Sequence, residues 1–399
     1  MPRLLFFLPF VSAVILSFGL AQLLLLRQLN RVWWEKKWIR RAAWSLPAVG
    51  VAFFILLVLC EYHGLRELGV IAGAISAISL ILEICLMFSL PISGAIRGAG
   101  RLVDSFARRK SGVEDLPTDR TRRLFFKGAA AAVPLATVVT GLGGIGRAFA
   151  TAKVSKKQFA YEGLEPGLQG LRILHLSDLH LAHYVTLEDL EQTLLRAETL
   201  SPDLILITGD IADDLTLLPD ALELIAGLRP RLGAYATVGN HEHFRGITEV
   251  RRLFSKSPVA LLVDEGVFLA TGNSSVFVAG INDPIAMHSV STEFFQSSIA
   301  LSLSNNPPDC FTILMSHRPD AFPFAARQSV DLTLAGHTHG GQIGFLGRSL
   351  LERHLPEKYL WGHYEIDNSQ LYTSCGMGHW FPFRLGCPPE APVIELIKS

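Results

Sequence analysis

The polar and apolar positions of this 399-residue chain divide it into two halves with different patterns. In residues 1–100, apolar positions form three long stretches, at about residues 4–26, 42–60 and 68–96. Each approaches or exceeds the roughly 20 residues that a helix needs to cross the hydrocarbon core of a bilayer. Core helices of a soluble protein are the alternative, but three such stretches so close together favour three transmembrane helices. Glu83 interrupts the third, and we expect it to face a neighbouring helix or to snorkel.

A fourth apolar stretch, about residues 128–149, is rich in Ala, Gly and Thr. Residues 27–41 carry six basic residues and residues 97–127 carry nine, whereas residues 61–67 carry only Arg66. By the positive-inside rule the two basic loops are cytoplasmic. Residues 101–150 then comprise a basic cytoplasmic loop and a fourth span. The sequence therefore predicts a multi-pass protein of the cytoplasmic (inner) membrane, with residues 151–399 on the extracytoplasmic side.

The segment before the fourth stretch resembles a twin-arginine export signal, with the sequence TRRLFFK at residues 121–127. Ala148-Phe149-Ala150 resembles a signal-peptidase site. An ordinary basic anchor at the cytoplasmic end of a helix is the alternative, and the sequence leaves both open.

Residues 151–399 change to short apolar runs that end near Gly, Asp, Asn or His. These runs read as buried strands at residues 171–177, 203–208, 234–238, 276–280, 311–316 and 332–335. Leucine and alanine at helical spacing separate the first three runs, which gives a β-α-β-α-β beginning. The pattern predicts a layered α/β sandwich with its chemistry at the carboxyl ends of the strands.

Metal-ligand residue types follow these strand ends in five short motifs. In chain order they are Asp178-Leu-His180, Gly209-Asp210, Gly239-Asn240-His241-Glu242, His317 and Gly336-His337-Thr338-His339. Carboxylate, amide and imidazole donors together suit Mn, Zn or Fe ions. A carboxylate has two oxygens, so Asp210 is the natural bridge between two metals. The motifs therefore predict a two-metal site.

The distribution of charge bears on which binding partners the chain can have. Residues 1–150 carry 18 Lys and Arg against 8 Asp and Glu, while residues 151–399 carry 18 against 28. The second half lacks a basic stripe, which argues against nucleic acid as a partner. The sequence leaves two alternatives for Cys375 and Cys387: a disulfide between them, or two free thiols.

The five motifs resemble those of the calcineurin-like metallophosphoesterase superfamily. The sequence GHTHGGQ at residues 336–342, with LYTSCG at 371–376 and CPPE at 387–390, resembles its membrane-linked bacterial branch. The resemblance covers about residues 170–397 and implies a metallophosphoesterase domain at 151–399, folded as a four-layer αββα sandwich of two mixed sheets.

The resemblance also implies roles for individual residues. One metal would be held by Asp178, His180, Asp210 and His339, and the second by Asp210, Asn240, His317 and His337. His241 would contact substrate and act in catalysis, by stabilising the transition state or protonating the leaving oxygen.

Other polar residues near the motifs are expected to have structural or supporting roles, or to contact substrate. We expect Asp213 and Asp214 to be solvated loop carboxylates and Glu242 to support His241 or a nearby loop. His175 is expected in the core, and Gly340 and Gly341 should let the backbone turn near the metals. His183 and His243 are possible substrate contacts, Arg318 fits a phosphate contact or a salt bridge equally, and His354, His363 and His379 are expected at the surface or behind the ligands.

The sequence thus predicts a membrane-anchored phosphohydrolase that cleaves phosphate mono- or diesters by attack of a metal-bound hydroxide. Its place beside a bilayer suggests a lipid-linked or envelope-related substrate. A cytoplasm-facing hydrolase of a UDP-diacylglucosamine type is one alternative, and a non-catalytic metal-binding sensor or assembly factor is another. The oligomeric state stays open.

Overall fold

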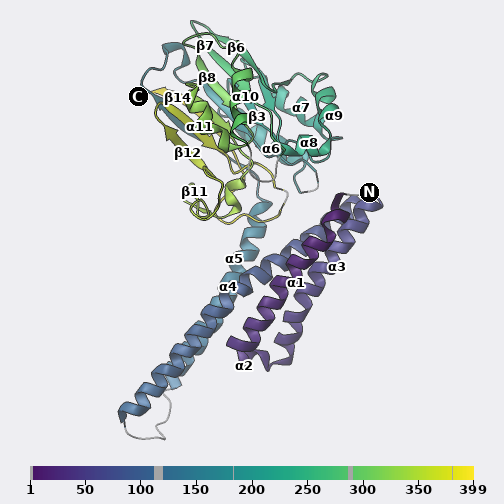
Figure 1. The fold of residues 1–399 in the computed structure, drawn as a ribbon, viewed down its shortest axis with the longest axis vertical. Helices are drawn as coiled ribbons and strands as arrows, with labels where there is room; N and C mark the ends of the chain where they lie inside the picture. The colour runs from purple at the N-terminus through teal and green to yellow at the C-terminus, as the bar shows by residue number, and fades with distance from the viewer. Residues whose placement is uncertain (1–2, 112–119, 183, 286–290, 380) are drawn as a thin grey trace. The chain divides into compact units, whose positions relative to one another are not determined.

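The computed structural model describes residues 3–111, 120–182, 184–285, 291–379 and 381–399. Contacts between residues divide the chain into two compact units, Met1–Gly146 and Arg147–Ser399. Figure 1 draws the first in purple and blue and the second in teal to yellow.

The first unit is helical. Its helices are α1 (Arg3–Leu29), α2 (Arg31–Trp34), α3 (Lys37–Tyr62), α4 (Arg66–Ser111) and α5 (Arg120–Ala148). Four of them contain a segment long and apolar enough to cross a membrane: Leu8–Leu29, Lys37–Tyr62, Glu67–Ala107 and Arg120–Ala148. Each of these helices contains one of the four apolar stretches predicted from the sequence, and α4 and α5 also extend into the predicted basic loop at residues 97–127.

Buried polar groups in this unit lie at helix contacts. Pro47 has no backbone N–H, so the carbonyl of Ala43 one turn earlier lacks its helical donor. Gln22 of α1 donates to that carbonyl from Nε2 at 3.1 Å. Glu83 is fully buried in α4, and a Cβ on Gly19 of α1 would lie 3.4 Å from its Oε1. Glu83 therefore faces a neighbouring helix and does not snorkel.

The arginine pair of the twin-arginine-like segment lies in the first turn of α5. Arg122 donates to Asp104 of α4 from Nη2 at 2.7 Å.

The second unit contains two six-stranded sheets and their covering helices (Figure 1). The first sheet has the order β1-β14-β2-β3-β4-β5 and the second β12-β13-β9-β8-β7-β6, with parallel and antiparallel pairs in both. The strands are β1 (Lys153–Tyr161), β2 (Arg172–Leu176), β3 (Leu204–Thr208), β4 (Ala234–Thr237), β5 (Ala260–Leu261), β6 (Glu265–Thr271), β7 (Ser274–Gly280), β8 (Phe311–Met315), β9 (Leu332–Ala335), β12 (Gly362–Ile366), β13 (Ser369–Thr373) and β14 (Glu390–Lys398). A hairpin of β10 (Gly344–Phe345) and β11 (Arg348–Ser349) stands apart.

Helices complete the four layers. They are α6 (Leu187–Glu198), α7 (Leu218–Gly227), α8 (Asn240–Arg245), α9 (Ile247–Phe254), α10 (Thr292–Ser302) and α11 (Phe322–Arg327), with single 3-10 turns η1 (Pro166–Leu168), η2 (Pro319–Ala321) and η3 (His339–Gln342). Helices α6, α7 and α9 pack on the first sheet, and α10 and α11 pack on the second. The predicted αββα sandwich of two mixed sheets is confirmed.

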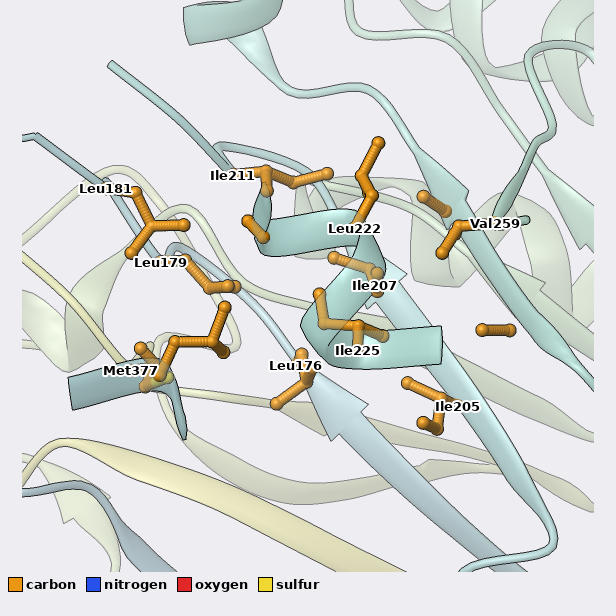
Figure 2. Packing of buried hydrophobic residues seen from close by; sticks show 14 of the residues in the cluster. Leu176, Leu179, Leu181, Ile205, Ile207, Ile211, Leu222, Ile225, Val259 and Met377 are labelled. Carbon is orange, nitrogen blue, oxygen red and sulfur yellow. The ribbon is translucent and has the colours of Figure 1, made fainter. Parts of the chain in front are cut away.

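Strand β3 shows why these sequences form buried strands. Its side chains alternate between the two faces of the sheet. Ile205 and Ile207 point into the layer under α7, where Figure 2 shows them beside Leu222 and Ile225. Leu204 and Leu206 point into the layer between the two sheets. Because both faces are covered, the strand is a continuous apolar run, as in other buried parallel strands.

The six predicted strands are present, but the outer strands of both sheets were not predicted. Strand β6 has mostly exposed or half-buried residues, and the buried β13 carries polar residues such as Gln370. Of the two alternatives left open for Cys375 and Cys387, the structure has the free thiols, and both are buried.

Candidate metal centre

The candidate ligands lie just after the ends of five strands, in loops or at the start of the next helical turn, at one edge of the sandwich. Asp178 and His180 follow β2, Asp210 follows β3, Asn240 follows β4, His317 follows β8, and His337 and His339 follow β9. Five of these residues have a left-handed backbone, namely Asp178 (φ 49°), His180 (φ 48°), Asp210 (φ 51°), His337 (φ 70°) and His339 (φ 48°). Such conformations are uncommon outside glycine and cluster at functional sites.

The first group of donors comprises Asp178, His180 and His339, with Asp210 at its edge. His180 Nε2 lies 3.2 Å from His339 Nε2 and 3.7 Å from Asp210 Oδ2. Asp178 Oδ1 lies 3.9 Å from the same His180 nitrogen and 3.6 Å from His339 Nε2. All four side chains are buried.

The second group comprises Asp210, Asn240, His317 and His337. His317 Nε2 lies at its centre, 3.1 Å from Asn240 Oδ1, 3.1 Å from His337 Nδ1 and 3.3 Å from Asp210 Oδ2. Asp210 thus borders both groups, as a bridging carboxylate would.

These spacings fit metal ions. Donors about 2.0–2.2 Å from one ion lie roughly 3–4 Å from one another, which is the range found in both groups. So many acceptor atoms repel one another at these distances unless a cation lies among them. The seven predicted ligands are therefore brought together, and their donor chemistry fits two divalent ions; which residues hold which ion stays a prediction.

Hydrogen bonds fix the orientation of two of the imidazoles. His317 donates from Nδ1 to the carbonyl of Thr208 at 2.8 Å, which turns Nε2 toward the ligand group. His180 does the same through Nδ1, 3.2 Å from Asp213 Oδ2. Partners of this kind behind metal ligands set the tautomer and the ring angle.

Glu242 holds the loop that carries Asp210. Its carboxylate accepts hydrogen bonds from the backbone N–H groups of Asp210 at 2.8 Å, Ile211 at 2.8 Å and Gly239 at 2.7 Å. Burial, with the charge of Asp210, raises its pKa to about 7. Glu242 was expected to support either His241 or a nearby loop, and its hydrogen bonds are to the loop.

The glycines of the motifs are required by close approaches. A Cβ on Gly239 would lie 2.3 Å from Asp210 Oδ1, and a Cβ on Gly336 would lie 2.1 Å from Asp178 Oδ2. Gly340 and Gly341 have φ of 64° and 60°, as expected for the turn after His339.

The electrostatics of the site are those of a cation-binding pocket. Burial lowers the pKa of His317, but the charge of Asp210 and its hydrogen bond outweigh burial and raise the pKa to about 10. Burial likewise lowers the pKa of His180, and Asp213, Asp210 and Asp178 raise it to about 9. Burial raises the pKa of Asp210, but the neighbouring imidazoles hold it well below its usual range. Protons and metal ions therefore compete for the same nitrogens, so metal binding would release protons.

His241 lies beside the ligand groups with its side chain 19% exposed, against 1% for His180 and 0% for His317. Its backbone N–H donates to Asp210 Oδ1 at 2.9 Å, and its Nδ1 lies 2.5 Å from Asp213 Oδ1. Nε2 is left toward the site, 3.8 Å from Asp210 Oδ2.

The expectation that Asp213 is a solvated loop carboxylate is wrong. Its side chain is 12% exposed and lies between His180 and His241, with Arg245 Nη2 3.1 Å from Oδ1. One carboxylate therefore orients both a predicted ligand and the predicted catalytic histidine. Its position three residues after Asp210 was the available signal. Asp214 instead accepts from the backbone N–H of Thr216 at 3.1 Å in a local turn.

The remaining singled-out residues lie outside the donor groups. Arg318 pairs with buried Asp283 at 2.8 Å, which is the salt-bridge alternative. His243 Nε2 lies 2.9 Å from Asn282 Oδ1. His175 is a core residue bonded to Thr208 Oγ1 at 2.9 Å, and burial lowers its pKa to about 3. His354 is exposed, His363 is bonded to Gln370, and His379 is buried. His183 lies outside the described residues.

Arg384 is a residue that sequence reasoning missed. It is fully buried and donates to the carbonyls of Cys375 at 2.7 Å and Gly378 at 2.5 Å. The backbone N–H of Gly378 in turn donates to the carbonyl of Asp178 at 2.7 Å. Arg384 Nη2 also lies 3.4 Å from His339 Nδ1. The guanidinium thus ties a loop to two predicted ligands, and nothing in its sequence context signals that role.

Comparisons with known proteins find a matching family and several relatives. A family described as calcineurin-like phosphoesterase matches residues 171–341. A Bos taurus protein called "Transmembrane protein with metallophosphoesterase domain" is 30% identical over 291 residues, which cover 70% of this chain and 64% of that protein. "Uncharacterized metallophosphoesterase YkuE" of Bacillus subtilis is 30% identical over 292 residues, covering 69% of this chain and 97% of that one. "Phosphodiesterase YaeI" of Escherichia coli is 28% identical over 237 residues, which cover 57% of this chain and 82% of that protein.

Replacing the shared carboxylate tests the two-group arrangement. In Asp210→Asn we expect both ions to bind weakly, because the one side chain that borders both groups loses its charge. Metal per chain, measured by inductively coupled plasma mass spectrometry after dialysis, should fall from about two ions to below one. His241→Ala is the matched control and should keep its metal. Wild-type metal content in Asp210→Asn would contradict the bridging assignment.

Asp213→Asn tests the orientation of His241. The amide cannot accept from both imidazoles as a carboxylate does, so we expect kcat per bound metal to fall by about 10²-fold or more. Metal content is measured in the same samples, because Asp213 also orients His180. Asp220→Asn, an exposed carboxylate on α7, should leave kcat unchanged. Equal rates for the two variants would show that Asp213 does not act through His241.

Proposed function

Because this chain belongs to the calcineurin-like phosphoesterase family, we propose that it is a membrane-anchored two-metal hydrolase of phosphate mono- or diesters. The observation that carries the proposal is the pair of donor groups that border Asp210 at one edge of the sandwich, with His241 beside them. The match to the bovine relative spans just under two thirds of that protein's length, so the proposal rests on the site and on the family.

The proposed ligands follow the two donor groups. Asp178, His180, Asp210 and His339 would hold one ion, and Asp210, Asn240, His317 and His337 the other. Mn, Zn and Fe all suit this mixture of oxygen and imidazole donors. Two ions held by these residues would supply Lewis-acid polarisation of a phosphoryl oxygen and water with a pKa lowered toward 7.

His241 is the proposed catalytic and substrate-contacting residue. Asp213 accepts from Nδ1, so the ring is held in one orientation and Nε2 is directed to the site. A proton at Nε2 can stabilise the transferring phosphoryl oxygens or pass to the leaving oxygen. The partial exposure of the side chain supports contact with a substrate from solution or from a membrane.

We further propose three parts for the chain: three transmembrane helices in residues 1–100, a basic cytoplasmic loop and fourth span in residues 101–150, and the phosphoesterase domain in residues 151–399. Four helices long and apolar enough to span support this division. The distribution of basic residues supports an extracytoplasmic domain. A domain fixed beside a bilayer suggests a lipid-linked phosphate ester as substrate, and the name of the Escherichia coli relative supports a diester.

The activity is tested on the purified full chain in detergent. We expect Mn²⁺-dependent cleavage of bis(p-nitrophenyl) phosphate or p-nitrophenyl phosphate, its loss after dialysis against EDTA, and its return with Mn²⁺, because the proposed nucleophile needs the ions. His241→Ala should lower kcat by about 10²-fold or more with metal still bound. No turnover of either compound with Mn²⁺, Zn²⁺ or Fe²⁺, despite two bound ions, would favour the sensor or assembly role.

The side of the membrane is tested by labelling the exposed carboxyl terminus. In Ser399→Cys we expect a membrane-impermeant maleimide to react with intact cells, because four spans after an outside amino terminus place residue 399 outside. The wild-type chain measures the background labelling, which should be low because four of its five cysteines are buried. Reaction only after permeabilisation would place the domain in the cytoplasm and favour the UDP-diacylglucosamine-type alternative.

A further inference from the structure

The second unit exposes a run of large apolar side chains in one short segment. This segment, called here the apolar hairpin, comprises residues 344–355 and includes β10 and β11. Phe345 is 64% exposed, Leu346 87%, Leu350 57% and Leu355 40%. Exposed apolar residues elsewhere in the described part of this unit lie singly on separate elements: Phe149, Leu195, Phe268, Ile285 and Leu301. Single exposures are ordinary, whereas a contiguous patch marks an interaction surface.

The base of the apolar hairpin is fixed to the metal centre. The hairpin follows η3, which begins at the predicted ligand His339. The backbone N–H of Gly344 donates to the carbonyl of Leu385 at 2.8 Å, and the N–H of Leu385 donates to the carbonyl of Gln342 at 2.8 Å. A Cβ on Gly344 would lie 2.5 Å from Cys387 Sγ. With the base packed this tightly, the exposed side chains hold a set position relative to the ligands.

Contacts within the second unit link its first residues to the base of the hairpin. The Phe149 ring, one residue after α5, packs edge-on against the His379 ring at 5.3 Å. Two residues further on, the carbonyl of Phe381 accepts from Gln342 Nε2 at 3.4 Å, at the base of the hairpin. The segment around His379 also contacts the metal loop, since Gly378 donates to the carbonyl of Asp178. The α5 junction, the hairpin base and the ligands are therefore neighbours within this unit.

The charges of the hairpin region suit a membrane surface. Arg348, Arg353 and the nearby Lys358 are exposed, as is Glu357, while Glu352 is half-buried. The guanidinium of Arg348 lies 4.2 Å from the centre of the Tyr364 ring. Exposed apolar side chains with basic residues nearby are found in segments that enter the headgroup region of a bilayer.

We propose that the apolar hairpin inserts Phe345, Leu346 and Leu350 into the bilayer that the chain's own helices cross, and so presents the metal centre to phosphate esters held in that bilayer. The occupant of this surface is lipid. The inference rests on the proposed membrane anchorage and phosphohydrolase function, and it adds the surface by which a lipid-linked substrate reaches the site.

Insertion is measured on the full chain without any activity assay. Leu346→Cys carries an NBD fluorophore, and Leu301→Cys, on α10 and 55% exposed, is the matched control. In proteoliposomes of phosphatidylcholine and phosphatidylglycerol, we expect a blue-shifted NBD emission at position 346 that lipids with a nitroxide on the acyl chain quench at least twofold more than at position 301. Equal quenching at the two positions overturns the proposal. So does a blue shift that already appears in detergent and resists nitroxide lipids, because a second copy of the chain would then cover the hairpin.

A second measurement connects insertion with substrate access. In the same proteoliposomes, Leu346→Glu should leave cleavage of soluble bis(p-nitrophenyl) phosphate unchanged and lower cleavage of a diacyl p-nitrophenyl phosphodiester in the bilayer at least tenfold. Leu301→Glu should change neither. Equal effects of the two variants on the bilayer substrate would overturn the role in access. A wild-type chain that cleaves neither compound would overturn the proposed function, while the fluorescence result still decides insertion.

Discussion

The structure of the second unit depends on keeping two groups of acceptor atoms within about 3–4 Å of one another around the single carboxylate of Asp210. Lone pairs this close together repel one another when no cation lies between them. The fold therefore has to hold each ligand side chain in place against that repulsion. It does so with rigid parts: buried strands that end at the site, backbone in the left-handed region, glycines where a Cβ would collide, and the carboxylate of Glu242 on three backbone N–H groups. These are the features expected of a site that is preorganised for ions.

The parts of this arrangement that follow from local chemistry could be predicted from the sequence. Strand β3 is a continuous apolar run because both of its faces are covered, and Asp210 comes directly after it. Parallel strands bring their carboxyl ends to one edge, so residues scattered from Asp178 to His339 could be assigned to one place. The outer strands could not be predicted in the same way. Strands β1 and β6 have partly exposed faces and polar residues, and their partners β14 and β7 are defined by the sheet and not by neighbouring sequence.

Residues that act through other residues escaped prediction for a related reason. Asp213 has the sequence context of a solvated loop, and only the approach of His180 and His241 from two other segments gives it a role. Arg384 is 45 residues from His339 in sequence and is bonded to carbonyl oxygens, which every residue possesses. A motif records residue types that chemistry requires at the metal, whereas these contacts are set by how loops meet in space.

The beginning of the second unit is linked to the metal loop by contacts that no motif records. Phe149 packs against His379, and the adjoining residues 377 and 378 donate to the carbonyls of Ser177 and Asp178. One ring contact and two backbone hydrogen bonds therefore connect the first residues of this unit with a predicted metal ligand. Because the hydrogen bonds join backbone groups, which nearly every residue possesses, the sequence gives no sign of this link.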